Sequence, residues 1–347
     1  MKAVTVIPRQ AGSAALTDVP EPPEVEGRVL VESLAVGVCG TDEEIVAGDY
    51  GRAPPGEERL VLGHESLGRV LHAPDDAGLS PGDLVVGYVR HPDPEPCLNC
   101  AAGEWDMCRN GRYTEHGIKE RHGFLRERYR LHAGHLVKVE PSLGVSGVLV
   151  EPTSVVEKCW DHLDRIGSRA RWEPRCALVT GAGPIGLLGA MIGVQRGLEI
   201  HVLDRVTEGP KPGLVKDLGG EYHTDLDDLD HDVDAVIECT GVGELAFEAL
   251  RRVHPNGVIA LAGISGRDRT YPLDADALNE RMVLQNIALF GSVNANRRHY
   301  EGAAKALTAA DPEWLGRLIG RTVPLEGWSD ALERRPDDVK VIVRTGA

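Results

Sequence analysis

The sequence lacks the features that mark membrane, nucleic-acid-binding and secreted proteins. It has no run of about 18 apolar residues, so we expect no membrane-spanning helix. Asp and Glu number 54 against 38 Lys and Arg, which gives a formal net charge of -16, whereas binding to nucleic-acid phosphates needs a basic surface. The N-terminus has no apolar signal region followed by a small-residue cleavage site. We therefore expect a cytoplasmic protein without nucleic-acid or membrane partners.

Cysteine is scarce and odd in number, with seven in 347 residues. An odd count in a long chain without a secretion signal argues against a disulfide framework. Aromatic residues make up only 4% of the chain, which weighs mildly against a strongly apolar ligand pocket.

The length predicts about two domains. Residues 1–153 contain short alternating runs such as "GRVLHA" and "GDLVVGYV" separated by turns, which is typical of a β-rich, barrel-like module. Residues 154–293 alternate short apolar β-branched runs with amphipathic runs of helical period, which predicts βαβ units and a doubly wound parallel sheet, an α/β domain. Residues 294–347 could complete either module, and we assign them to the first.

The segment "LVTGAGPIG" contains the dinucleotide fingerprint G-x-G-x-x-G. We expect a strand over 176–180 before it and a helix after it, the context that the motif requires. The glycines allow a tight turn and close approach to a pyrophosphate, which the helix N-terminus then binds. The sequence therefore predicts a nicotinamide-cofactor site at these residues: Gly181, Gly183, Pro184, Ile185 and Gly186.

An acidic residue follows the next strand, about 20 residues on, where a carboxylate binds the ribose hydroxyls. This residue is Asp204, and its charge repels a 2′-phosphate, which favours NAD. The adjacent Arg205 can hold that phosphate, so NADP is an open alternative. We also place Thr240, in "DAVIECTG", in the cofactor site.

The apolar run "VLGHESLGRV" places His64 and Glu65 side by side, and Cys39 lies in "GVCGTDEEIV" of the same module. Zinc binds thiolate, imidazole and carboxylate, and a catalytic zinc site leaves one position for water or substrate. Each residue alone has a plain structural explanation: a buried cysteine, a core histidine and a capping glutamate. From spacing alone, the three together are compatible with a catalytic zinc site and also with these structural explanations.

The order of these motifs resembles the zinc-dependent medium-chain alcohol and polyol dehydrogenases over nearly the whole chain. "RYTEHGI", "HGFLRE", "LVEPTSVVEK" and "FGSVNANRRHY" resemble the glucose (aldose) 1-dehydrogenase branch of that superfamily. The resemblance implies a GroES-like catalytic domain joined to a Rossmann domain.

The resemblance also implies roles for individual residues. The catalytic zinc ligands would be Cys39, His64, Glu65 and Glu151. The catalytic residues would be Thr41, Glu65 and Glu151. The sugar would contact Thr41, Glu115, Glu151 and Asn294, and the nicotinamide would lie near Val293 and Asn294.

Two positions depart from the family pattern. Many relatives have a histidine five residues after the zinc cysteine as a proton relay, and here that residue is Glu44. The structural-zinc pattern C-x2-C-x2-C-x7-C keeps only its last three cysteines, because Pro94 replaces the first. Asp93 or Glu95 could replace the lost ligand, or the loop is metal-free. The remaining cysteines of this pattern are Cys97, Cys100 and Cys108.

The metal and cofactor motifs predict a dehydrogenase, and the resemblance implies an NAD(P)-dependent aldose 1-dehydrogenase that takes hydride from C1 of D-glucose and releases the aldonolactone. The alternative is a zinc-dependent polyol or alcohol dehydrogenase on the same scaffold. A different class of protein, a zinc-free reductase or a cofactor-binding structural protein, is also conceivable. The presence of all four expected zinc ligands (Cys39, His64, Glu65 and Glu151) weighs against that class. The run "IALFGSV" resembles an edge strand that could pair between subunits, so we expect a dimer or a tetramer.

Overall fold

The structure, a computed structural model, describes residues 1–265 and 270–346 and divides into two compact units. Unit 1 comprises residues 1–154 and 294–347, and unit 2 comprises residues 155–293. The long helix α3 (Val150–Gly167) begins in unit 1 and continues into unit 2. No helix within the described ranges is long and apolar enough to cross a membrane.

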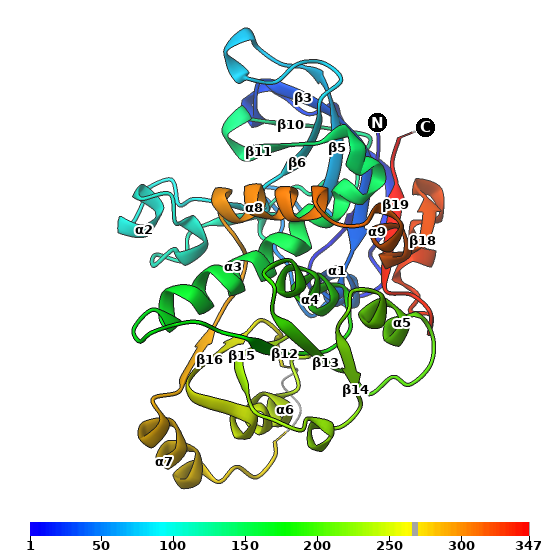
Figure 1. Ribbon diagram of the computed structural model, residues 1–347. Coiled ribbons are helices and arrows are strands. Elements are labelled where there is room, and N and C mark those ends of the chain that lie inside the picture. Colours follow the sequence, from blue (N-terminus) through cyan, green and yellow to red (C-terminus); the bar gives the residue numbers. More distant parts are fainter. Residues whose placement is uncertain (266–269, 347) are drawn as a thin grey trace. The chain divides into compact units, whose positions relative to one another are not determined.

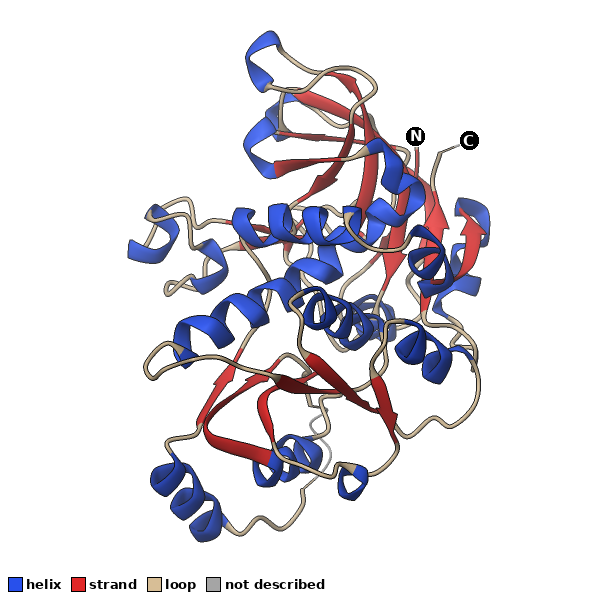
Figure 2. Ribbon diagram, viewed as in Figure 1, coloured by secondary structure: helices blue, strands red, loops and turns tan. Residues whose placement is uncertain are grey.

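Unit 1 consists mainly of short strands (Figures 1 and 2). Among the described residues its largest sheet has the order β11-β6-β5-β3-β19-β18, with β10 also paired to β3. Two small sheets, β2-β1-β4 and β7-β8-β9, complete it. The strands of this unit are β1 (Lys2–Val6), β2 (Ala15–Asp18), β3 (Val29–Val38), β4 (Leu60–Val61), β5 (Glu65–His72), β6 (Leu84–Gly87), β7 (Arg90–His91), β8 (Thr114–His116), β9 (Glu120–Arg121), β10 (Arg128–Leu131), β11 (Leu136–Val139), β18 (Ile319–Pro324) and β19 (Lys340–Arg344).

Strand β3 organises this unit because it pairs with three neighbours. Its residues alternate between buried and half-buried over the first half, as expected for a strand with one face on the core. Gly37 pairs with Glu65 of β5, and Val38 pairs with Val341 of β19. The register therefore brings the start of β5 and of β19 to the end of β3. The helices of unit 1 are α1 (Gly40–Ala47), α2 (Leu98–Ala101), α8 (Arg297–Thr308) and α9 (Pro312–Leu318).

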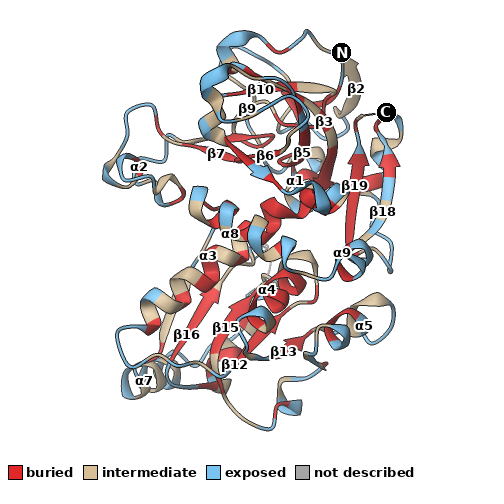
Figure 3. Ribbon diagram, turned by 45° about the horizontal axis from the view of Figure 1, so that its top comes forward, coloured by how far each residue is buried: buried red, intermediate tan, exposed pale blue. Residues whose placement is uncertain are grey.

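Unit 2 contains a parallel sheet of order β14-β13-β12-β15-β16-β17, as the βαβ pattern predicts. Its central strands are buried along nearly their whole length (Figure 3). The strand order reverses beside β12, and ligands bind doubly wound sheets at such a point. The strands are β12 (Cys176–Thr180), β13 (Glu199–Leu203), β14 (Glu221–His223), β15 (Val233–Glu238), β16 (Val253–Leu261) and β17 (Ala288–Gly291).

The helices of unit 2 follow the strands in the alternating order of βαβ units: α4 (Pro184–Gln195), α5 (Pro210–Asp217), α6 (Gly243–Glu248) and α7 (Ala275–Gln285). The strand expected over 176–180 and the helix after it are present as β12 and α4. The prediction of an α/β fold with a β-rich module and a doubly wound sheet is confirmed.

Candidate active site

Three side chains of types that can bind zinc converge in unit 1, at the end of β3 and the start of β5. The potential ligand atoms of Cys39, His64 and Glu65 all lie within 4.8 Å of one another. Cys39 Sγ is 3.0 Å from His64 Nε2. Gly63 adopts a φ of +86°, which only glycine adopts readily, and so turns the chain before His64. A Cys–His–carboxylate group fits zinc chemistry.

Asp42 holds the other side of the histidine. Its Oδ1 lies 3.5 Å from His64 Nδ1, and its Oδ2 accepts a hydrogen bond from the Cys39 backbone N–H at 3.1 Å. Metal-binding histidines usually have such a carboxylate on the second ring nitrogen, which leaves the first nitrogen for the metal. Burial lowers the pKa of His64, but the Cys39 sulfur and the Asp42 carboxylate outweigh it and raise that pKa well above its usual value. This histidine thus lies in a negative environment suited to a cation.

Glu65 is fixed by an ion pair with Lys340, which is as deeply buried as Glu65 itself. Lys340 Nζ also donates a hydrogen bond to the Val38 carbonyl at 3.0 Å. A Cβ on Gly37 would lie 2.0 Å from Glu65 Oε2, so the glycine provides the space for this carboxylate. The strand pairing and the lysine together set where Glu65 points.

Glu151 lies in the first turn of α3 and is buried. Burial, followed by the charge of Glu65, raises the pKa of Glu151 to about 7. Within the described chain, Glu151 is not part of the 4.8 Å group, although it interacts electrostatically with Glu65 and His64. Two buried carboxylates that repel each other form a site that a divalent cation stabilises.

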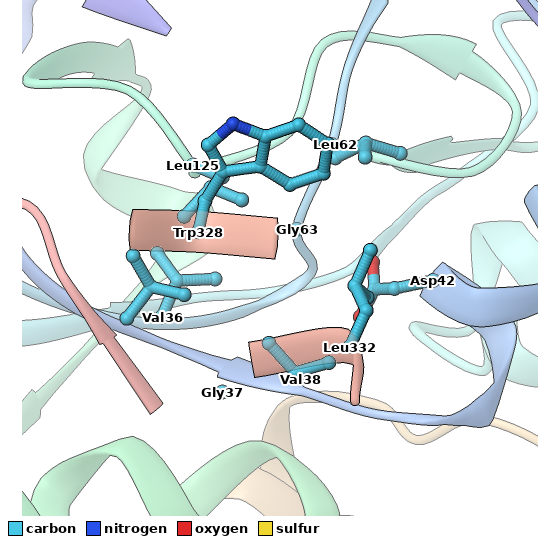
Figure 4. Close-up of a pocket in the computed structure, with 10 residues that line it drawn as sticks. Val36, Gly37, Val38, Asp42, Leu62, Gly63, Leu125, Trp328 and Leu332 are labelled. Atoms are coloured by element: carbon cyan, nitrogen blue, oxygen red, sulfur yellow. The ribbon is translucent and has the colours of Figure 1, made fainter. Parts of the chain in front are cut away.

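A small pocket beside this group is lined by apolar side chains around Asp42 (Figure 4). Val36, Val38, Leu62 and Trp328 contribute to it. An apolar wall strengthens the electrostatic interactions of the adjacent charged groups. Its lining offers little to sugar hydroxyls, so we assign it no substrate.

Helix α1 carries the other residues expected near the zinc. Thr41 is half-buried in its first turn, two residues after Cys39, whereas Glu44 is exposed. The position at which relatives have a histidine relay therefore faces solvent here.

Glu115 and Asn294, both predicted to bind the sugar, contact each other in unit 1. Asn294 Nδ2 donates to Glu115 Oε1 at 3.0 Å. The buried Arg90 holds the same oxygen, with its Nε and one terminal nitrogen each 3.0 Å away. Arg90 in turn lies over the Tyr113 ring at 3.7 Å. Two side chains, which supply three donor nitrogens, thus hold the Glu115 carboxylate.

The three cysteines of the loop around α2 also converge. The sulfur atoms of Cys97, Cys100 and Cys108 lie within 4.8 Å of one another. Backbone N–H groups of Arg109 and Cys100 lower the pKa of Cys97 to about 6. All seven cysteines, which lie in the described part of the chain, are free.

The two residues considered as a fourth ligand have other partners. Asp93 is buried and accepts hydrogen bonds from Asn110, Arg112 and the Glu95 backbone. Glu95 is exposed and pairs with Arg112 at 2.8 Å. Asp93 is therefore held by the loop itself, whereas Glu95 has only one side-chain partner, at the surface.

In unit 2, the glycine motif forms the turn between β12 and α4. Gly181 has a φ of +89°, and a Cβ on Gly186 would lie 1.8 Å from the Gly181 carbonyl oxygen, so both positions require glycine. At Gly183 a Cβ would meet nothing within 4 Å, which leaves the loop open to a ligand. Helix α4 then begins with Pro184 and Ile185. The loop fits the pyrophosphate of a dinucleotide.

Asp204 follows β13 directly and lies against this loop. Its carboxylate accepts hydrogen bonds from the Ala182 N–H at 2.7 Å and the Val206 N–H at 3.0 Å. Lys211 Nζ lies 2.9 Å from the same carboxylate, and Arg205 is exposed beside it. A carboxylate and two cations thus surround the expected ribose position.

Two further predicted cofactor residues also lie in unit 2. The Thr240 methyl group would be 3.0 Å from a Cβ on Gly181, so Thr240 packs against the glycine turn. Val293 is exposed, and its carbonyl accepts a hydrogen bond from Lys158 at 2.9 Å.

Sequence analysis missed four residues that orient these side chains: Asp42, Arg90, Lys211 and Lys340. For two of these residues, the sequence itself contains a recognisable pattern. Asp42 occupies the third helical position after Cys39, where a capping side chain is expected. Lys340 interrupts the apolar strand "VKVIVRT", where an unpaired lysine would be costly. Arg90 and Lys211 are recognisable only from their contacts.

The chain is similar to known dehydrogenases over its whole length. Residues 144–345 match the model of the glucose dehydrogenase C-terminus, and residues 25–141 match that of the alcohol dehydrogenase GroES-like domain. It is 40% identical over 359 residues to a glucose 1-dehydrogenase of Methanocella arvoryzae, with 100% of both chains covered. It is 41% identical over 356 residues to a glucose 1-dehydrogenase of Thermoproteus tenax, with 99% of both covered.

A solved structure of Haloferax mediterranei glucose dehydrogenase in complex with NADP, Zn and gluconolactone superimposes with a TM-score of 0.92, at 33% identity and with 100% of both chains covered. The ligand group in unit 1, the glycine loop in unit 2 and these matches agree. The chain belongs to the zinc-dependent medium-chain dehydrogenase superfamily and, within it, to the glucose dehydrogenase branch.

Proposed function

We propose that this chain is a zinc-dependent aldose 1-dehydrogenase that oxidises D-glucose at C1 to the aldonolactone and reduces NAD(P)⁺. The observation that carries the proposal is the buried group of Cys39, His64 and Glu65 in a chain of this family. The related Haloferax structure holds zinc, NADP and gluconolactone, which supports the same reaction here.

In this proposal Cys39, His64 and Glu65 hold the zinc ion, and Glu151 is the remaining carboxylate. Bound zinc supplies Lewis acidity, which lowers the pKa of a hydroxyl group that it contacts. Asp42 fixes the His64 ring so that Nε2 faces the ligand group, and Lys340 balances the charge of Glu65. These two residues therefore position ligands without touching the substrate.

The reaction removes a proton and a hydride from the sugar. The C1 hydroxyl would pass its proton to Thr41 Oγ1 as Thr41 releases its own hydroxyl proton, while the C1–H bond breaks and its electron pair leaves with the hydrogen as hydride for the nicotinamide. A C=O bond forms at C1, which yields the lactone, NAD(P)H and one proton. Because Glu44 is exposed on the same helix, we propose that the proton passes from Thr41 towards solvent along α1.

We propose that Glu115, Asn294 and Glu151 bind the sugar hydroxyls. Carboxylates accept hydrogen bonds from vicinal hydroxyls, and an amide can both donate and accept. Arg90 and Asn294 fix Glu115 before substrate arrives, which reduces the entropy that binding costs. Positioning of this kind is the main contribution of the protein, because the hydride chemistry belongs to the cofactor.

We propose that unit 2 binds the cofactor, with the pyrophosphate on the glycine loop, Thr240 packed against that loop and the ribose on Asp204. Val293 and Asn294, at the chain junction of the two units, would contact the nicotinamide. The Asp204 carboxylate favours NAD, while Lys211 and Arg205 supply positive charge for the 2′-phosphate of NADP. NAD is the preferred cofactor in this proposal, and NADP is accepted.

We also propose a second zinc ion on Cys97, Cys100 and Cys108, with Glu95 or water as the fourth ligand. The low pKa of Cys97 supports it, because zinc binds the thiolate form. For assembly, β17 is the last strand of its sheet, and we propose that this edge pairs with a second copy in a dimer or tetramer. The zinc content of Cys97→Ser, compared with the wild type, tests the second zinc ion. Light scattering of the wild type measures its oligomeric state.

The central test is reduction of NAD and NADP by the purified protein with aldoses, polyols and simple alcohols, each with and without a chelator. Chelator-sensitive turnover on D-glucose is the expected result. Turnover on polyols or alcohols alone would overturn the sugar assignment but keep both sites. Turnover on glucose that resists complete removal of zinc would overturn the metal assignment.

A further inference from the structure

A second cluster of histidine and glutamate side chains lies in unit 2, on β13, β14 and the loop before β15. Glu199 and His201 stand two residues apart on β13 and so share one face of the sheet. Potential ligand atoms of Glu199, His201 and His231 lie within 4.8 Å of one another. The cluster shares no residue with the sites described above.

His201 is the centre of this cluster. It is only 1% exposed, yet its Nε2 atom has no hydrogen-bond partner. Its other nitrogen, Nδ1, lies 2.9 Å from Nε2 of the buried His223. When Nδ1 donates its proton to His223, Nε2 carries a free lone pair, which is the form that binds metals.

In this tautomer, the lone pair of Nε2 faces the negative charge of a glutamate. Glu199 Oε1 lies 3.5 Å away, which is too long for a good hydrogen bond. Two acceptors that face each other in this way repel unless a cation lies between them. The separation is close to the roughly 3.3 Å that separates two ligands bound at about 2.0 Å around a tetrahedral zinc ion.

His231 provides the third side of the cluster. Its ring lies 5.2 Å from that of His201 between centroids, at a steep angle. Its Nδ1 contacts the Asp230 carboxylate, so Nε2 is the nitrogen that a metal would use without breaking this contact. A carboxylate behind a ligating histidine is the usual outer partner in zinc sites.

We propose that His201 Nε2, Nε2 of His231 and the Glu199 carboxylate bind a zinc ion, with the fourth position open to water. The Glu199 and His231 side chains are 59% and 40% exposed, so the ion can enter from solvent. Two imidazoles and one carboxylate are a known three-ligand zinc set.

A neighbouring set, formed by His201, Glu221 and His223, is less suitable. Its ligand atoms also lie within 4.8 Å of one another. However, a metal bound there would have to replace the hydrogen bond between His201 Nδ1 and His223 Nε2. The same hydrogen bond prepares Nε2 for the first set, which is therefore favoured.

Zinc in this site would join β13 to the loop that precedes β15. No residue of the site belongs to the proposed catalytic or cofactor groups, so occupancy should change stability rather than turnover. A ligand that binds only the folded state raises the midpoint of unfolding.

The test is zinc stoichiometry and thermal unfolding of the full chain after zinc loading and dialysis. We expect His231→Gln and Glu199→Gln each to lose one zinc per chain, to lose the part of the zinc-induced rise in Tm due to this site, and to keep wild-type turnover on glucose. His254→Gln, an exposed histidine of the same unit, is the matched control and should behave as wild type. Glu221→Gln should also keep its zinc.

Equal zinc content in the wild type, His231→Gln and Glu199→Gln would overturn the proposal. Loss of zinc in Glu221→Gln but not in Glu199→Gln would also overturn it, in favour of the neighbouring set. Both substitutions change exposed side chains, which a folded protein tolerates, so misfolding would not hide the result.

Discussion

Lys340 Nζ forms a buried ion pair with the Glu65 carboxylate, although the two residues come from opposite ends of the chain. Strand β3 pairs with the strands that carry both residues, and Gly37 leaves room between them. Removing one partner of a buried pair leaves an uncompensated charge, which costs about 3–5 kcal/mol. The ligand carboxylate is therefore stabilised by a cation even before a metal binds.

Lys340→Met should lower the unfolding free energy of the metal-free protein by about 3–5 kcal/mol, because Glu65 then lies unpaired beside Glu151. Zinc should recover part of this loss, since the ion replaces the missing positive charge. Urea unfolding with chelator and with zinc measures both. The control is Lys138→Met, which removes the exposed partner of Asp83. It should lower the free energy of unfolding by at most about 1 kcal/mol. Equal losses in the two variants would contradict the role of Lys340.

Gly37→Ala should damage the site by sterics alone. The new Cβ would lie 2.0 Å from Glu65 Oε2 and 2.9 Å from Lys340 Cε, so the ion pair must move. We expect a stability loss of about 1–3 kcal/mol and at least a roughly tenfold drop in kcat. Gly316→Ala, in α9, adds a Cβ with nothing within 4 Å and serves as the control. Full activity in Gly37→Ala would show that the position of Glu65 is unimportant.

Glu115→Gln keeps the shape of the side chain but removes the charge that pairs with Arg90. We expect the KM for glucose to rise about tenfold or more, because a charged hydrogen bond to a sugar hydroxyl is lost. The KM for the cofactor should not change. Steady-state kinetics measure both KM values. The control is Glu120→Gln, because Glu120 lies on the next strand, β9, and pairs with Arg52 at 2.7 Å. Equal changes in the two KM values would remove Glu115 from the sugar site.

Asp204→Ala and Lys211→Ala should shift cofactor preference in opposite directions. The first removes the carboxylate that repels a 2′-phosphate, so the ratio of kcat/KM for NADP to that for NAD should rise about tenfold or more. The second removes a cation 2.9 Å from that carboxylate, so the ratio should fall. Kinetics with both cofactors at saturating glucose give the ratio. A shift of both variants in the same direction would disprove the paired role.

Much of the fold was predictable because its signals are local. Alternating β-branched runs indicated the parallel sheet, and the glycines at 181 and 186 occupy positions where the backbone excludes other residues. The sites were less predictable because they depend on contacts between distant segments. The sequence places Cys39 and His64 in one module, but their 3.0 Å separation depends on the pairing of β3 with β5. Arg90 and Lys211 belong to no sequence motif and are recognisable only from their contacts with Glu115 and Asp204.

A buried histidine cluster in unit 1 should make stability depend on pH. His116 Nδ1 lies 2.6 Å from the His122 carbonyl, and its Nε2 lies 3.0 Å from His91 Nε2. The first contact keeps a proton on Nδ1, so Nε2 accepts from His91, and both rings are held neutral. Burial, followed by the positive charge of Arg121, lowers the pKa of His116 well below its usual value. Burial and His116 lower that of His91.

The sign of the effect follows from these shifts. In the unfolded chain both histidines take up protons as the pH falls through about 6.5, whereas in the folded protein they do not. Acidification below that value therefore favours unfolding, by up to about 1.4 kcal/mol per pH unit for each ring. We expect imidazole ¹⁵N shifts of His116 to stay constant between pH 8 and 5 in the folded protein, because burial and Arg121 keep the ring neutral. A His116 midpoint near 6.5 would show that the cluster is not held neutral, and the acid sensitivity would then have another origin.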